Sequence, residues 1–155
     1  MSHFKIIQLS SDPVEENKTI NETDIYDDPL FEQQSDWGGD TCEYDKVIHR
    51  LARELAPVAD IDKAAHTITF KDPDTIADIL VNHAEYIVRR FKDAVEKKAF
   101  CAGEYELRTM ITEPCGIDDL FHLGHCKKAS TFLAEYLTGY WPRTMHIGAI
   151  LDAHC

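Results

Sequence analysis

Three groups of side chains in this sequence have the types and spacing that chemistry requires, and the first is a cluster of thiols and imidazoles. The string CGIDDLFHLGHC contains Cys115, His122, His125 and Cys126. Thiolates and imidazoles are the ligands that zinc prefers, and four of them close a tetrahedral site. Such a site stabilises a fold rather than catalysing a reaction, because no coordination position stays open. The spacing matches no standard zinc finger, since no CxxC pair is present, and the alternative is a turn of the core.

The second group is a cysteine–histidine pair. We expect Cys42 just inside the N-terminus of a helix, where the helix dipole lowers the pKa of a thiol. His146 lies in the apolar string HIGAIL, and Asp152 follows closely. This pattern resembles that of papain-like cell-wall peptidases, in which a cysteine at a helix start faces a histidine on a strand. The resemblance implies that Cys42 is the nucleophile, His146 the base and Asp152 the residue that orients the base. The alternative is a histidine of the sheet and a cysteine of a helix cap.

The third group is a concentration of carboxylates near the N-terminus. Residues 1–45 hold twelve acidic residues against two basic ones, a net charge of −10, whereas the whole chain carries −12. The densest stretch, DIYDDPLFEQQSDWGGD, has six carboxylates, no Lys or Arg, and three aromatic side chains. We call residues 10–40 the acidic arm. Its charge disfavours direct contact with nucleic acid or anionic membranes and favours a basic partner.

Three accounts of what the acidic arm does differ in the role that they give to its aromatic residues. A disordered, solubilising segment is usually poor in aromatic residues, so simple disorder is disfavoured. In the second account, the arm wraps its own domain and buries the aromatic side chains while the carboxylates face solvent. In the third, the carboxylates stand in for phosphates in a basic groove of another protein, since Arg pairs bidentately with either group. The second and third accounts are compatible. The residues predicted to contact a partner are the carboxylates and two aromatic anchors, namely Asp24, Asp27, Asp28, Glu32, Asp36 and Asp40 with Phe31 and Trp37.

The N-terminal string KIIQLSSDPVEEN, the arm that follows it and the short, acidic chain resemble the small accessory proteins of phages and bacterial mobile elements. Among these, antirestriction and anti-CRISPR proteins often act as acidic mimics of nucleic acid. The resemblance implies a stoichiometric inhibitor of a nucleic-acid-handling enzyme, without catalytic residues.

Composition limits the remaining choices. A chain of 155 residues that is 44% hydrophobic predicts one domain, residues 1–155, with enough apolar material for its own core. The five cysteines, without a recognisable signal peptide, favour free thiols and a cytoplasmic location. We expect no cofactor, because the phosphate-binding patterns GxxxxGK[ST] and GxGxxG are both absent.

The spacing of apolar residues predicts the strands and helices that must position these groups. Strands are predicted at residues 4–9, 66–70, 104–112 and 144–151, where β-branched and apolar residues run or alternate. Helices are predicted from Asp40, with Glu43 completing a capping box, from Asp72-Pro73 over about seven turns, and over residues 127–137. Residues 10–40 and 114–124 are predicted to be irregular. The main body, residues 41–155 with the strand at 4–9, is therefore expected to be an α+β or α/β fold, a small mixed β-sheet with about three packed helices in β-α-β-α-β-α-β order.

A basic cluster, Arg89, Arg90 and Lys92, lies on the long predicted helix. It is either a solvated face or a surface on which the acidic arm docks within the same chain.

Overall fold

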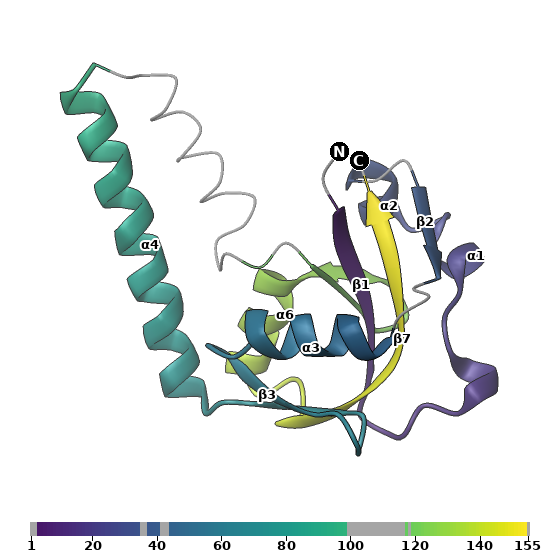
Figure 1. Ribbon diagram of the computed structural model, residues 1–155. Coiled ribbons are helices and arrows are strands. Elements are labelled where there is room, and N and C mark those ends of the chain that lie inside the picture. Colours follow the sequence, from purple (N-terminus) through teal and green to yellow (C-terminus); the bar gives the residue numbers. More distant parts are fainter. Residues whose placement is uncertain (1–2, 35–36, 41–43, 99–116, 118, 155) are drawn as a thin grey trace.

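The chain folds around one mixed β-sheet, as a computed structural model shows for residues 3–34, 37–40, 44–98, 117 and 119–154 (Figure 1). Helices and short strands alternate along these residues, so the fold is α+β, as the sequence predicts.

The sheet has seven strands within the described residues. Their bounds are β1 His3–Ser10, β2 Trp37–Asp40, β3 Ala59–Asp62, β4 Thr67–Phe70, β5 Leu120–His122, β6 Cys126–Lys128 and β7 Thr144–His154. The strand order is β3-β4-β7-β1-β5-β6. The long strand β7 pairs with β1 along one edge, while β4 and β2 pair with its beginning and its end along the other. Only the β1–β5 pairing is parallel among those described.

The described helical segments differ greatly in length. They are the 3₁₀ turn η1 Glu16–Lys18, α1 Glu22–Ile25, α2 Pro29–Gln34, α3 Tyr44–Glu54, α4 Pro73–Glu96 and α6 Ala129–Leu137. The first three lie in the acidic arm, which has more regular structure than the sequence predicts.

Both faces of β1 are covered, which explains why apolar side chains occur on both sides of this strand. Successive side chains of a strand point to opposite faces. Ile7 and Leu9 enter one core with α3, α6 and the first turn of α4, whereas Phe4 and Ile6 enter a second core. We call these the helix-side core and the arm-side core. The acidic arm covers the second one.

A bulge interrupts the pairing of β1 with β7. Ile7 lies opposite Ile150, but Leu9 lies opposite Ile147, so β7 has one extra residue between these pairs. The bulge includes Gly148. Because a bulge reverses the alternation of side chains, residues on its two sides change face relative to one another.

Gln8 fills the gap that the bulge creates. Its Oε1 accepts hydrogen bonds from the N–H groups of Ala149 and Ile20, both at 3.1 Å, and its Nε2 donates to the Lys18 carbonyl at 2.8 Å. A Cβ at Gly148 would lie 2.3 Å from this Oε1, so only glycine leaves room for the Gln8 side chain. Gln8 thus joins β1, β7 and the acidic arm.

The start of α4 matches its sequence signal. The Asp72 Oδ1 accepts from the Thr75 N–H at 3.0 Å, and Pro73 occupies the first turn. Ile76 is fully buried in the helix-side core, and beyond it the helix extends away from the sheet (Figure 1). Its 24 residues span about 36 Å at the usual rise per residue.

Several predicted elements need correction. Asp40 ends strand β2 rather than capping a helix, and α3 begins at Tyr44. Strands β2, β3, β5 and β6 were not predicted, and the predicted strand at 104–112 lies outside the described residues. The acidic arm and the basic cluster Arg89, Arg90 and Lys92 lie on opposite sides of the molecule, so the cluster does not dock the arm of its own chain (Figure 1). None of the described helices combines the length and apolar character needed to cross a bilayer.

Candidate functional site: an acidic surface fixed to the sheet

The described part of the acidic arm exposes a set of carboxylates. Seven acidic side chains are exposed between residues 11 and 32, namely Asp12, Glu15, Glu16, Glu22, Asp24, Asp27 and Glu32. The basic residue among them is Lys18, whose Nζ lies 3.1 Å from Glu15. A salt bridge between two exposed side chains is weak and readily exchanged, so this surface keeps a strong negative potential.

Three apolar side chains anchor the acidic arm. Ile20, Ile25 and Phe31 are 8%, 0% and 2% exposed and belong to the arm-side core, with Phe4 and Ile6 of β1. Full burial of one such side chain contributes about 1.5–3 kcal/mol to folding. The arm is therefore held by its own hydrophobic contacts, although among the aromatic residues on which the second account relies Phe31 is buried and Tyr26 is 40% exposed.

Asp28 provides a polar anchor between these apolar ones. It is 8% exposed and directly precedes α2. Its Oδ1 accepts from the N–H groups of Leu30 at 2.9 Å and Phe31 at 3.3 Å, as an N-cap does. Its Oδ2 accepts from the N–H of Cys126 in β6 at 2.6 Å. One carboxylate thus starts a helix of the arm and ties it to the sheet.

The short helix α1 is held by a capping box. The Asn21 Oδ1 accepts from the Thr23 N–H at 2.9 Å, and the Asp24 Oδ2 accepts from the Asn21 N–H at 2.8 Å. Glu22 and Asp24 lie in its first turn, where the helix dipole favours negative charge. These bonds fix the Asp24 carboxylate and the backbone of α1 that carries Glu22.

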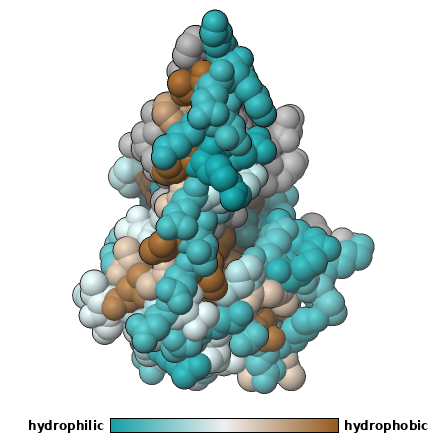
Figure 2. All heavy atoms as spheres, turned by 90° about the vertical axis from the view of Figure 1, so that its left-hand side faces the viewer, coloured by the Kyte–Doolittle hydropathy of each residue, from teal (hydrophilic) through white to brown (hydrophobic). Residues whose placement is uncertain are grey.

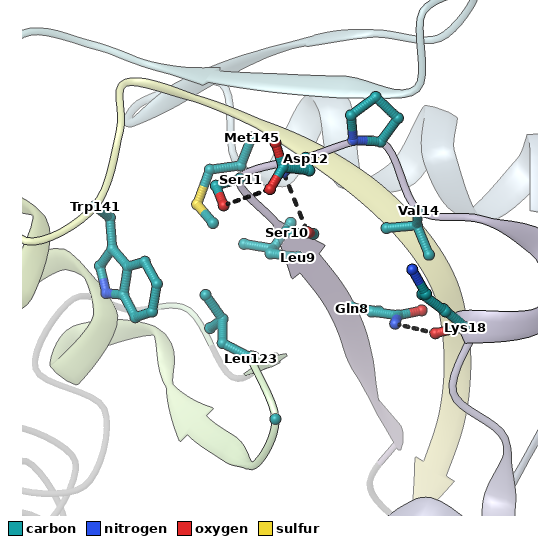
Figure 3. Close-up of a pocket in the computed structure, with 12 residues that line it drawn as sticks. Gln8, Leu9, Ser10, Ser11, Asp12, Val14, Lys18, Leu123, Trp141 and Met145 are labelled. Carbon is teal, nitrogen blue, oxygen red and sulfur yellow. Dashed lines mark hydrogen bonds between the residues drawn. The ribbon is translucent and has the colours of Figure 1, made fainter.

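A cleft of about 440 Å³ lies where the arm leaves β1 (Figure 3). One wall is apolar and consists of Leu123, Trp141 and Met145, while Asp12 and Lys18 line other parts of it. Trp141 is held in place because its Nε1 donates to a Glu135 oxygen at 2.7 Å. A second cleft, of about 350 Å³, lies farther along the arm, and Asn21, Asp24 and His122 are among its lining residues.

The arm also changes the proton affinity of the groups beneath it. Burial lowers the pKa of the His122 imidazole below its usual range, although the carboxylates of Asp28 and Asp24 oppose this shift. Burial raises the pKa of the Cys126 thiol to about 12, and the Asp28 carboxylate adds to the shift. Both residues therefore favour their neutral forms.

The predicted zinc ligands are brought only partly together. His122 and Cys126 lie opposite each other in β5 and β6, and His125 is exposed in the turn between them. Cys115 lies outside the described residues. Within those residues no group of three or more potential ligands surrounds a common point. The raised pKa of Cys126 also opposes the thiolate that zinc binding requires.

The predicted hydrolase residues are not assembled in the described part of the chain. Cys42 lies outside it. Ile147 and Ile150 both face the helix-side core, on either side of the bulge. By alternation Asp152 shares the face of Ile150, whereas His146 points to the opposite face. Asp152 therefore does not orient His146, and the prediction that it does is wrong.

The residues predicted to contact a partner fall into three sets. Asp24, Asp27 and Glu32 are exposed, as such a role requires. Phe31 and Asp28 are buried and serve the fold, so they do not lie on the acidic surface. For the remaining three residues the structure describes no side chain. Asp36 lies outside the described residues, and Trp37 and Asp40 are placed only by their backbone, in β2 beside β7.

Sequence reasoning missed two contributors to this site, Asp28 as an anchor and Gln8 as a clamp. The signal for the first was present, because Asp28-Pro29 has the same N-cap and proline pattern as Asp72-Pro73. No local signal points to Gln8, since its partners lie in the arm and in β7.

Comparison with protein-family models, with curated proteins and with solved structures finds no match for this chain.

Proposed function

We propose that this protein is a non-enzymatic binding protein, an inhibitor that presents its acidic surface to a basic, nucleic-acid-binding protein. The observation that carries this proposal is the combination of exposure and anchoring in one segment. Seven carboxylates face solvent between residues 11 and 32, while the same segment is buried through Ile20, Ile25, Asp28 and Phe31.

Anchoring matters because binding by an ordered surface costs less conformational entropy than binding by a disordered tail. A carboxylate held in a fixed position can replace a phosphate, since both groups accept paired hydrogen bonds from an arginine fork. Complementary charge of this kind accelerates association and suppresses partners of the wrong sign.

The cleft beside Asp12 suits the side chains that a nucleic-acid-binding surface offers. Arg and Lys have apolar stems and charged ends. The apolar wall formed by Leu123, Trp141 and Met145 matches such a stem, and the Asp12 carboxylate matches the charged end. The acidic surface and this cleft lie side by side on the arm, so a single basic partner can use both.

The experiment compares two variants that lose the same charge. The arm variant carries Glu16→Gln, Glu22→Gln, Asp27→Asn and Glu32→Gln, and the control carries Asp60→Asn, Asp78→Asn, Asp93→Asn and Glu96→Gln, all at exposed positions. Each protein is immobilised and exposed to an extract of the native host, and the retained proteins are identified by mass spectrometry.

We expect the wild type and the control variant to retain the same basic nucleic-acid-binding protein, which salt and duplex DNA both elute. The arm variant should lose it. Equal retention by the arm variant, or retention that neither salt nor DNA reduces, would contradict the proposal.

A further inference from the structure

A stripe of exposed side chains runs along α4, on the side of the molecule away from the acidic arm. Val81, Glu85, Val88, Lys92 and Val95 follow one another at spacings of four, three, four and three residues. This spacing keeps all five on one line of a helix surface, the repeat on which helices pair. We call these five residues the valine stripe.

The valines of this stripe are open to solvent. Val81, Val88 and Val95 are 56%, 41% and 40% exposed, and they make up half of the large hydrophobic side chains described as exposed. Figure 2, in which the α4 side of the molecule faces the viewer, shows apolar side chains beside a hydrophilic ridge. Three exposed valines at a heptad repeat mark a contact surface rather than scattered apolar residues.

The charges in the stripe indicate what covers it. Glu85 lies three residues before Val88, and Lys92 lies four residues after it. If a second α4 packs on the stripe in the opposite direction, each Glu85 faces the Lys92 of the other copy, and Val81 lies toward Val95. A parallel pair would place like charges together. Since the stripe is complementary to itself only in the antiparallel direction, a second copy of this chain matches it better than an unrelated surface.

We propose that the chain forms a two-fold symmetric dimer through the valine stripe of α4. The geometry of the rest of the molecule permits this in spite of its net charge of −12. The acidic arm and α4 lie on opposite sides of the sheet, so the two arms of a dimer point away from each other (Figure 1). At an ionic strength of 0.1 M, charges more than about 10 Å apart through solvent are largely screened.

The dimer is tested by sedimentation velocity and light scattering over a wide range of protein concentrations. We expect the wild type to shift from 17.7 kDa to twice this mass as concentration rises. Val88→Glu should abolish the shift, because it places like charges at the centre of the contact. Tyr140→Glu, at another exposed apolar position outside α4, should leave it unchanged.

A charge exchange tests the direction of pairing. Glu85→Lys alone and Lys92→Glu alone should each raise the dimer dissociation constant about tenfold, because attractive pairs become repulsive. The double variant should return it to within a few-fold of the wild-type value. Circular dichroism confirms that each variant stays folded. A wild type that is monomeric at every concentration, or a double variant no better than the singles, would overturn the proposal.

Discussion

In the acidic arm and in α4, the sequence pattern and the burial of the side chains disagree in opposite ways. The arm has little periodicity and many charges, yet its few apolar residues, Ile20, Ile25 and Phe31, are almost completely buried. The helix α4 has a strong helical pattern, yet only Ile76 and Ile87 of its side chains are buried. Periodicity thus identifies a helix without showing what the helix packs against, whereas a few well-placed anchors can fix an irregular segment. We therefore expect substitutions in the arm to cost more stability than comparable substitutions in the outer part of α4.

The largest expected effect tests this contrast with two apolar truncations. Phe31→Ala removes a 2% exposed ring from the arm-side core and should lower the free energy of unfolding by about 3–5 kcal/mol. Val81→Ala in α4, where the side chain is 56% exposed, should change it by less than about 0.5 kcal/mol in dilute solution. Urea denaturation measures both values. Similar losses from the two variants would break the comparison.

The next effect concerns the polar anchor. Asp28→Ala should cost about 2–3 kcal/mol, because the helix cap is lost and the buried N–H of Cys126 keeps no acceptor. The matched control is Asp27→Ala, which removes the exposed neighbouring carboxylate and should be close to neutral. If both substitutions cost the same, Asp28 does not tie the arm to the sheet.

A smaller effect is expected where Gln8 crosses the bulge. Gly148→Ala should cost about 1–3 kcal/mol, since the added Cβ would displace the Gln8 amide from its three hydrogen bonds. In a Gln8→Ala background the same substitution should cost much less, because the clash is gone. A double-mutant cycle measures the coupling between the two residues. Additive effects would show that the clamp is not formed.

The smallest effect is a dependence of stability on pH. Burial lowers the pKa of folded His122 below its ordinary value of about 6.5, so the unfolded chain binds more protons between these two pKa values. The free energy of unfolding should therefore fall as the pH drops below about 6.5. His122→Gln should flatten this part of the curve. A wild-type curve without this decline would contradict the burial of His122 beneath the arm.

Much of the fold could be predicted from sequence. Strands β1 and β7 are long and mostly apolar, and helix α4 has a clear N-cap. The strands β2, β3, β5 and β6 could not be predicted. They contain three or four residues each, and CKK of β6 has no alternation to detect. Such short strands form because their neighbours offer hydrogen bonds and a buried face, which is information from distant parts of the chain.

The candidate site was predictable as a segment but not residue by residue. Charge asymmetry identified the arm, and its aromatic residues indicated that it is not simply disordered. The division of roles among Asp24, Asp27 and Asp28 depends on which carboxylate reaches the Cys126 N–H, and that contact spans 98 residues of sequence. Local patterns carry no information on a contact of this kind.

Native-state hydrogen exchange of individual amides tests most directly whether the acidic surface is a fixed part of the fold. The N–H group of Ile20 donates a hydrogen bond to Gln8, and those of Leu30 and Phe31 donate to Asp28, so these bonds should protect the three amides from exchange. We predict that they exchange nearly as slowly as the Ile7 amide in β1, and more slowly than the amides in the outer half of α4. Exchange of the arm amides at the rate of an unstructured peptide, while Ile7 stays protected, would contradict the account.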